Sequence, residues 1–269
     1  NYHYDLAPKT WQMLERFRGG TALFTCPHMP IKCAGAPQKI AYLAADHFRR
    51  SGLGDEARIV LATATPSIFG VPAFAETLED VIEHYGIDAR YGHALVRIDP
   101  TARLATFEAE AAGETKEVTI PYDILHASPP QSAPDFIKRS PLAGPQGWID
   151  VDKHTLRHTR FDNVFALGDA TNTPNAKTAA AVRKQAPVVV ANLLSAMEDR
   201  EPTAFYNGYG ACPLTTSYQK ILLAEFDYTG EPTPTFQFID TLRERRDFGT
   251  FKHYALPALY WHGMLRGLA

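Results

Sequence analysis

The thiol of Cys33 has the sequence surroundings of a reactive nucleophile. It lies in the stretch Cys26 to Lys39, where small residues and prolines on both sides predict an irregular, tight loop. Pro37 suits the first turn of a helix, so Cys33 should come just before a helix N-terminus. That position, together with the neighbouring Lys32 and Lys39, lowers the pKa of a thiol and favours the thiolate. The sequence therefore predicts a nucleophilic cysteine in this loop.

A second stretch with chemical potential runs from Asn163 to Thr178. Its short apolar run, 164–167, has the length of a buried strand and stops at Gly168-Asp169; Lys177-Thr178 then open a strong helix-forming segment. Strand, Gly-Asp, loop and helix make one half of a dinucleotide-binding unit. Gly168 would let a ligand approach the backbone, and Asp169 could accept hydrogen bonds from polyol hydroxyls. A plain strand-to-helix turn with an Asp cap explains this stretch equally well.

The elements that would position these residues alternate between strands and helices, which is typical of an α/β fold. Residues 21–25 and 57–63 are apolar like buried parallel strands, whereas the segments 87–93, 94–98 and 103–109 alternate like antiparallel strands. The stretch after 57–63 contains no G-x-G-x-x-G, so a nicotinamide site has no support there. We expect the other elements as follows: helices over about 37–50, 74–85 and 177–197, further strands over 118–120 and 124–127, and a strand pair within 215–227.

Composition excludes several classes of protein. With 269 residues and 45% hydrophobic content, the chain can bury one large core or two modest ones. A net charge of -3 without a basic run indicates no nucleic-acid partner. Three widely spaced cysteines do not form a disulfide framework and fit a reducing compartment. No apolar stretch has the length of a membrane span, and Asn1 is preceded by neither an initiator Met nor a signal peptide, so we expect a piece of a longer protein.

Two further features leave alternatives open. The tail from Leu242 to Ala269 is first basic and then aromatic, which suits either a membrane interface or a helix packed on the core of the protein itself. Cys26 and His28 lie near Cys33, but zinc sites usually need four closely spaced ligands, so we expect no metal and interpret Cys26 as a buried thiol without a role in the chemistry.

Across nearly all of its length the chain resembles the sulfide:quinone oxidoreductases, which are FAD-dependent flavoproteins of the disulfide-reductase superfamily. The resemblance is strongest to the branch that includes the mitochondrial enzymes. The motifs that carry it are I-K-C-A-G-A-P-Q-K at 31–39, N-V-F-A-L-G-D-A-T at 163–171, K-T-A-A-A-V at 177–182, Y-N-G-Y-G-A-C-P-L-T at 206–215, L-A-E-F-D-Y at 223–228 and L-Y-W-H-G-M-L-R-G at 259–267.

The resemblance implies a glutathione-reductase-like α/β fold of the dinucleotide-binding FAD/NAD(P) type, in three layers with an antiparallel β excursion. It divides the chain into a middle NAD-like domain (1–130), a crossover (131–147), the returning half of an FAD-binding domain (148–199) and a C-terminal region (200–269). The first FAD unit of the family, with its G-x-G-x-x-G, is absent from these residues. We therefore expect a fragment of a two-Rossmann-domain protein whose FAD site is incomplete and which is inactive by itself.

The resemblance also implies roles for individual residues. Cys33 and Cys212 would form a redox-active pair that oxidises hydrogen sulfide, with Cys212 as the persulfide carrier and Cys33 as the thiolate beside the flavin; the reverse order stays open. Gly168 and Asp169 would bind FAD, and Lys39 would lie near the flavin. The residues expected at the pyrimidine edge of the flavin, where a cation and amides stabilise negative charge, are Lys177, Thr178, Ala179 and Ala180.

The implied partners are hydrogen sulfide, a sulfur acceptor (sulfite, a thiol or a growing polysulfide) and a membrane quinone as electron acceptor. The tail would dip into the bilayer and help to line the quinone entry. The protein would then be peripheral on the inner (cytoplasmic) membrane of a bacterium or on the mitochondrial inner membrane, and a homo-oligomer stays open. The alternatives are a type II NADH dehydrogenase, a flavocytochrome sulfide dehydrogenase subunit, and a non-catalytic thiol-sensing or binding domain.

Overall fold

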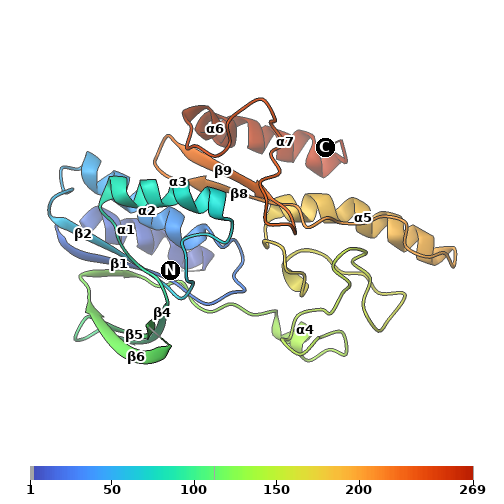
Figure 1. Ribbon diagram of the computed structural model, residues 1–269, viewed down its shortest axis with the longest axis horizontal. Helices are drawn as coiled ribbons and strands as arrows, with labels where there is room; N and C mark the ends of the chain where they lie inside the picture. Colours follow the sequence, from blue (N-terminus) through green and yellow to red (C-terminus); the bar gives the residue numbers. More distant parts are fainter. Residues whose placement is uncertain (1–2, 112, 269) are drawn as a thin grey trace.

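The computed structural model describes residues 3–111 and 113–268, and a parallel sheet lies at the centre of its first half (Figure 1). The strand order is β3-β2-β1-β7, and all three pairings are parallel. The last five residues of both β1 and β2 are buried, as expected for strands covered on both faces. The bounds are β1 (Gly20–Cys26), β2 (Ala57–Thr63), β3 (Asp88–Arg90) and β7 (Ile124–His126).

The structure confirms the predicted strands at 21–25 and 57–63 but corrects the one at 87–93. We expected an antiparallel strand there, and β3 instead pairs with β2 in parallel. The reason is the helix between them, α3 (Pro72–Tyr85), which carries the chain back along the sheet before β3 begins. Alternating apolar and polar residues do not indicate whether a strand pairs in parallel or antiparallel with its neighbour.

Helices cover one face of this sheet. A continuous core joins α1 (Ala7–Arg16), α2 (Ala36–Arg50) and α3 to the sheet, and Tyr42 of α2 and Phe74 of α3 are fully buried in it. The predicted helices 37–50 and 74–85 are thereby confirmed. Because α2 follows β1 directly, β1, the loop 27–35 and α2 form one strand–turn–helix unit.

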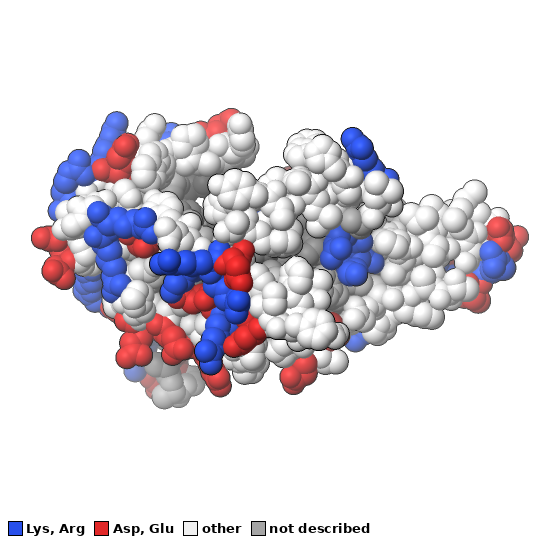
Figure 2. Space-filling model, turned by 90° about the horizontal axis from the view of Figure 1, so that it is seen from above, with Lys and Arg blue, Asp and Glu red and all other residues white. Residues whose placement is uncertain are grey.

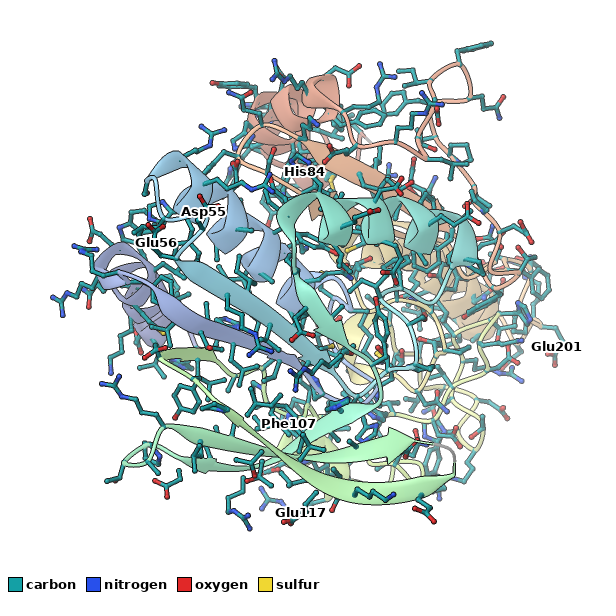
Figure 3. The ribbon with its side chains drawn as sticks, turned by 60° about the vertical axis from the view of Figure 1, so that its left-hand side comes forward. Asp55, Glu56, His84, Phe107, Glu117 and Glu201 are labelled. Carbon is teal, nitrogen blue, oxygen red and sulfur yellow. The ribbon has the colours of Figure 1, made fainter. Side chains whose placement is uncertain are left out.

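An antiparallel sheet covers the other face. It consists of β4 (His93–Asp99), β5 (Leu104–Ala111) and β6 (Glu114–Pro121), in the order β4-β5-β6. Phe107 of β5 is fully buried against Leu23 and Val60 of the parallel sheet. Figure 3 shows Phe107 between the two sheets, whereas Glu117 of β6 projects away from the molecule. Helices, parallel sheet and antiparallel sheet make the three layers that the sequence predicted.

The second part of the chain is built differently. Between β7 and β8, the described residues contain α4 (Asp135–Lys138), the 3-10 turn η2 (Gly168–Ala170) and α5 (Ala179–Met197), and no strand. The predicted strand 164–167 is wrong: Phe165 makes one isolated bridge to Arg157, and the run is only half-buried. A strand needs a neighbour along its length, and the structure offers this run a single paired residue.

The long helix α5 buries polar side chains and exposes several large apolar ones. Gln185 and Asn192 are fully buried and serve the backbone of the neighbouring loops. Val190 and Leu194 are each more than half exposed, and Met197 is 74% exposed. A surface helix of a globular domain normally turns its apolar face toward the core. The outward face of α5 therefore has the composition of a surface that is usually buried.

The C-terminal region packs against the first half of the chain. β8 (Gly210–Thr215) and β9 (Ile221–Phe226) form an antiparallel hairpin that packs on α2 and belongs to the same core. The predicted strand pair within 215–227 therefore begins earlier, at Gly210, and Cys212 lies on its first strand. Above the hairpin lie α6 (Arg246–Thr250), the π-helical turn η3 (Phe251–Ala255), α7 (Leu256–His262) and the 3-10 turn η4 (Met264–Arg266) (Figure 1).

Candidate functional site

Two cysteines from distant parts of the chain meet in the structure. The sulfurs of Cys33 and Cys212 lie 3.7 Å apart, although 179 positions separate the residues. Cys212 is buried on β8, and Cys33 is half-buried in the loop before α2; both thiols are free. The sulfurs are in van der Waals contact, so a small movement would join them as a disulfide. The pair can therefore alternate between a dithiol and a disulfide.

The backbone around Cys33 is held in an unusual conformation. Its φ of 59° lies in the left-handed region, which residues other than glycine rarely adopt and which costs of the order of 1 kcal/mol. Two hydrogen bonds fix it: the N–H of Cys33 donates to the carbonyl of Lys177 (3.0 Å), and its own carbonyl accepts from the N–H of Ala36 (2.8 Å). The thiol is thus positioned by the main chain rather than by a flexible loop.

This loop takes the place that phosphate-binding glycines occupy in a dinucleotide unit. Such a unit carries its G-x-G-x-x-G in the turn between the first strand and the first helix. Here that turn is 27–35, and its sequence P-H-M-P-I-K-C-A-G has a single glycine. The turn after β2, residues 64–71, also lacks the motif. The Cys33 thiol lies where a nucleotide diphosphate would approach α2 in such a unit.

Gly35 makes the contact between the sulfurs sterically feasible. A Cβ on this residue would lie 2.8 Å from Cys212 Sγ and 2.2 Å from Leu214 Cδ2. Its φ of -80° is ordinary, so the position requires space rather than backbone freedom. Sequence analysis had not singled Gly35 out, because the need for a small side chain comes from a strand about 180 residues away.

Lys39 is the cation of the site. Its ammonium lies 3.2 Å from Cys33 Sγ and 4.0 Å from Cys212 Sγ, one turn into α2. The pKa of Cys33 is lowered to about 5 by the hydrogen bond from Cys212 and by the charge and hydrogen bond of Lys39, against the opposing effect of burial. The pKa of Cys212 is raised by the thiolate beside it and by burial. The reduced pair is therefore asymmetric, with its negative charge on Cys33.

The predicted dinucleotide-binding residues meet at the start of α5. Gly168 is buried with φ 70°, and its N–H donates to Gln185 Oε1 of α5 (2.7 Å). Asp169 is exposed beside it. Thr178 is the N-cap of α5 and accepts from the N–H of Ala181, so the helix begins at Ala179, two residues later than expected.

Lys177 is not a solvated helix-start lysine. It is only 6% exposed, its ammonium lies 4.5 Å from the centroid of the Trp148 ring, and it donates to the carbonyl of Thr171. Burial lowers its pKa to about 8. With its carbonyl it holds Cys33, so Lys177 connects the sulfur site to the Gly168-Asp169 turn. The sequence predicted Lys177 beside the flavin but gave no sign of the hydrogen bond between its carbonyl and Cys33.

A cavity of about 640 Å³ lies at the carboxyl ends of β1 and β2. Ala34, which follows Cys33, and Gln38 of α2 line one side, and Thr63 and Phe226 contribute to others. Cys26 also reaches this cavity, and burial raises the pKa of its thiol. Within residues 3–111 and 113–268 no group of three or more His, Cys, Asp or Glu side chains could hold a metal ion.

Comparison with curated proteins shows which proteins this chain is similar to. The chain is 46% identical over 268 residues to the mitochondrial sulfide:quinone oxidoreductase of Mus musculus, covering 99% of this chain and 59% of the relative. It is 40% identical over 269 residues to that of Dictyostelium discoideum, covering 99% and 58%. This chain is a homologue of the sulfide:quinone oxidoreductases. It spans somewhat under three-fifths of the length of these relatives, and no family model matches it.

Solved structures agree on the fold. The sulfide:quinone oxidoreductase of Aquifex aeolicus superposes with a TM-score of 0.69 at 16% identity, covering 94% of this chain and 60% of that one. A chain in the mitochondrial ATP synthase structure of Tetrahymena thermophila gives 0.76 at 20% identity, covering 96% and 61%. The water-forming NADH oxidase of Lactobacillus brevis gives 0.51 at 15% identity, covering 84% and 46%. The predicted dinucleotide-binding α/β fold is thereby confirmed.

Proposed function

We propose that the protein containing this chain oxidises sulfide to sulfane sulfur through the Cys33–Cys212 pair and delivers the electrons, by way of FAD, to a quinone. The observation that carries the proposal is the contact of the two sulfurs beside Lys39, on a chain homologous to sulfide:quinone oxidoreductases. The chemistry needs a soft nucleophile attacking a sulfur whose leaving group is a stabilised thiolate.

The asymmetry of the pair supports one order of events. Hydrosulfide attacks the sulfur of Cys212 in the oxidised pair; the bond between the two cysteine sulfurs breaks, and its electron pair stays on Cys33. The products are a persulfide on Cys212 and a thiolate on Cys33, next to the ammonium that stabilises it. The lowered pKa of Cys33 makes it the better leaving group, which favours the predicted roles over the reverse order. A nucleophilic acceptor then removes the outer sulfur and leaves the Cys212 thiolate.

The residues at the start of α5 fit one part of an FAD site. Asp169 is exposed beside the N-terminus of a 19-residue helix, where an anionic diphosphate is stabilised and polyol hydroxyls find an acceptor. FAD held there would supply the two-electron acceptor that the sulfur pair needs. The ammonium of Lys177 is engaged by Thr171, so Lys177 and Thr178 would contribute main-chain groups, together with Ala179 and Ala180. Lys39 would stabilise the Cys33 thiolate and would also lie near the flavin.

The domain division at 130, 147 and 199 also belongs to this proposal. The outward apolar face of α5, and the fact that the described residues form no strand between β7 and β8, support the idea that 148–199 is half of a domain. Its other half would lie in the part of the relatives that this chain does not span. The FAD site in these residues would then be incomplete, and the 269-residue chain alone would be inactive.

The cavity at the ends of β1 and β2 offers a route for the sulfur substrate and the sulfur acceptor. It begins at Ala34, next to Cys33, and its lining is mostly apolar with hydroxyls from Thr63 and Thr65. A cavity of this size accommodates a small thiol or a short polysulfide. The acceptor would thus approach the pair from the sheet side.

The C-terminal region supports contact with a membrane and its quinone. Tyr254, Tyr260 and Trp261 are each at least 45% exposed, and Leu265 and Leu268 continue the apolar surface. Figure 2, which looks down on α6 and α7, shows most of the charged side chains toward one end, a smaller group at the other end, and a largely uncharged surface between them. Aromatic residues of this kind suit the interface of a bilayer. No helix in the described ranges has both the length and the apolarity to cross a membrane. We place the protein at a mitochondrial inner membrane or a bacterial inner (cytoplasmic) membrane. That it forms a homo-oligomer remains a separate prediction.

Quinone reduction by the whole protein in membranes, with sulfide as donor, tests the proposal. We expect sulfide-dependent reduction that Cys33→Ser and Cys212→Ser each abolish and that NADH does not replace. Turnover with NADH alone would favour the NADH dehydrogenase alternative. A whole protein that binds no flavin would favour the thiol-sensing domain.

A further inference from the structure

The loop that carries Cys33 is held by a side chain from the stretch between β7 and α4. We propose that Gln131 is a positioning residue of the sulfur pair: it accepts a hydrogen bond from the main chain next to Cys33 and so keeps the reduced thiol in place for closing the disulfide with Cys212. This inference rests on the proposed function, because it gives Gln131 a part in the same disulfide chemistry.

The first observation is the contact itself, which joins segments 99 positions apart. The N–H of Lys32 donates to Gln131 Oε1 at 2.9 Å, and Gln131 is half-buried. A main-chain N–H can only donate, so the oxygen of the side-chain amide, and not its nitrogen, faces Lys32. The role of Gln131 toward the loop is therefore that of a hydrogen-bond acceptor.

The second observation is that three successive peptide groups around the thiol are anchored. The group that ends at Lys32 is held by Gln131. The next group donates from the N–H of Cys33 to the carbonyl of Lys177 (3.0 Å), and the third accepts, through the Cys33 carbonyl, from the N–H of Ala36 (2.8 Å). Because peptide groups are planar, fixing those on both sides of Cys33 fixes its φ and ψ, and with them the direction of its Cα–Cβ bond.

The third observation is that Gln131 is the anchor that acts through its side chain. Lys177 contributes a main-chain carbonyl, and its position is itself fixed by the contact of its ammonium with the Trp148 ring (4.5 Å to the centroid) and by the N-cap of α5 at the next residue. The N–H of Ala36 belongs to the first turn of α2. A substitution can therefore remove the Gln131 anchor and leave the other two in place.

The anchoring matters because the conformation that it holds is unfavourable by itself. The φ of Cys33 is 59°, in the left-handed region that a residue with a Cβ seldom adopts. With one anchor removed, the reduced loop gains conformations in which the Cys33 sulfur leaves its contact of 3.7 Å with Cys212. In the oxidised pair the covalent bond holds the two sulfurs together in any case. Loss of the anchor therefore favours the open dithiol over the disulfide.

The test is the equilibrium of the pair with glutathione in the whole protein, kept free of oxygen. The two thiols and one molecule of oxidised glutathione give the Cys33–Cys212 disulfide and two molecules of reduced glutathione, so the crosslinked fraction at graded glutathione ratios yields the equilibrium constant. We expect Gln131→Met and Gln131→Ala each to lower this constant about three- to tenfold, the effect of one lost hydrogen bond. Gln131→Glu keeps an acceptor oxygen and should stay close to the wild-type value.

Two controls separate positioning from general damage. Gln146→Met makes the same chemical change at an exposed residue of the predicted crossover 131–147, and Phe107→Leu weakens the core between the two sheets; both should leave the equilibrium constant of the folded protein unchanged.

An unchanged constant in Gln131→Met and Gln131→Ala, an equal fall in Gln131→Glu, or an equal fall in either control would overturn the inference. Sulfide-dependent quinone reduction is measured on the wild-type whole protein. Its absence overturns the proposed function, while the glutathione equilibrium still decides the role of Gln131.

Discussion

The N–H of Cys33 donates a hydrogen bond of 3.0 Å to the carbonyl oxygen of Lys177. This bond joins the loop that carries the reactive thiol to the segment that opens α5. An isolated parallel bridge between Lys32 and Lys177 and a hydrogen bond from the N–H of Lys32 to Gln131 Oε1 reinforce the same junction. The sulfur pair and the predicted FAD residues therefore form one connected structure rather than two independent sites.

Lys39, and not Lys32, should control the ionisation of Cys33. The pKa of Cys33 is lowered to about 5, so its thiolate should persist as the pH falls from 8 to about 5 and disappear below that. Lys39→Met should raise this midpoint by about one to two units, since it removes a cation at hydrogen-bond distance. The pH dependence of Cys33 alkylation in the reduced protein, followed by peptide mass spectrometry, measures it. Lys32→Met is the control; an equal shift there would refute the assignment.

Gly35→Ala should separate the two sulfurs. The added methyl would collide with Cys212 Sγ and Leu214 Cδ2, so the loop must move away from β8. Mild oxidation should then yield little or none of the peptide that joins Cys33 to Cys212, whereas the wild-type protein gives it readily. Gly70→Ala is the control, because a Cβ there meets no atom within 4 Å. Undiminished crosslinking in Gly35→Ala would show that the contact tolerates a larger residue.

Lys177 should make the free energy of unfolding depend on pH in the alkaline range. Burial depresses its pKa in the folded state to about 8, below the unfolded value of about 10.4. Between these values the unfolded state binds more protons, so this residue makes the free energy of unfolding rise with pH across that window, and contributes no pH dependence below it. In Lys177→Met the rise should be absent. Urea unfolding of both proteins at a series of pH values compares them; parallel curves would contradict the prediction.

Asn192 should be essential to the position of α5. Its side-chain amide donates to the carbonyls of Thr155 and Ala204, and its oxygen accepts from the N–H groups of Thr203 and Ala204. Asn192→Ala removes four hydrogen bonds made by a fully buried side chain and should lower the free energy of unfolding by about 3 kcal/mol. The exposed Asn163 provides the control, since Asn163→Ala should change it by less than about 0.5 kcal/mol. Denaturant titration measures both, and a loss below 1 kcal/mol for Asn192→Ala would argue against the network.

The sequence by itself determined the elements whose cause is local. Continuous apolar runs at β1 and β2 and the helical segments α2, α3 and α5 follow from patterns within 7 to 19 neighbouring residues. The surroundings of Cys33 were equally local: a helix start and a nearby lysine predict a reactive thiol. The motifs at 31–39, 163–171 and 206–215 point to the family by themselves, and the pairing of Cys33 with Cys212 follows from that resemblance.

Only the tertiary structure decided what depends on residues far apart in sequence. The direction of β3, the strand position of Cys212 and the space required at Gly35 each arise from packing between segments separated by tens to hundreds of positions. The predicted strand 164–167 failed for the same reason, since a strand forms only where a neighbour pairs with it. Side-chain patterns encode which face of a segment is apolar, but not which surface it meets; α5, whose apolar face is outward, shows that difference within these residues.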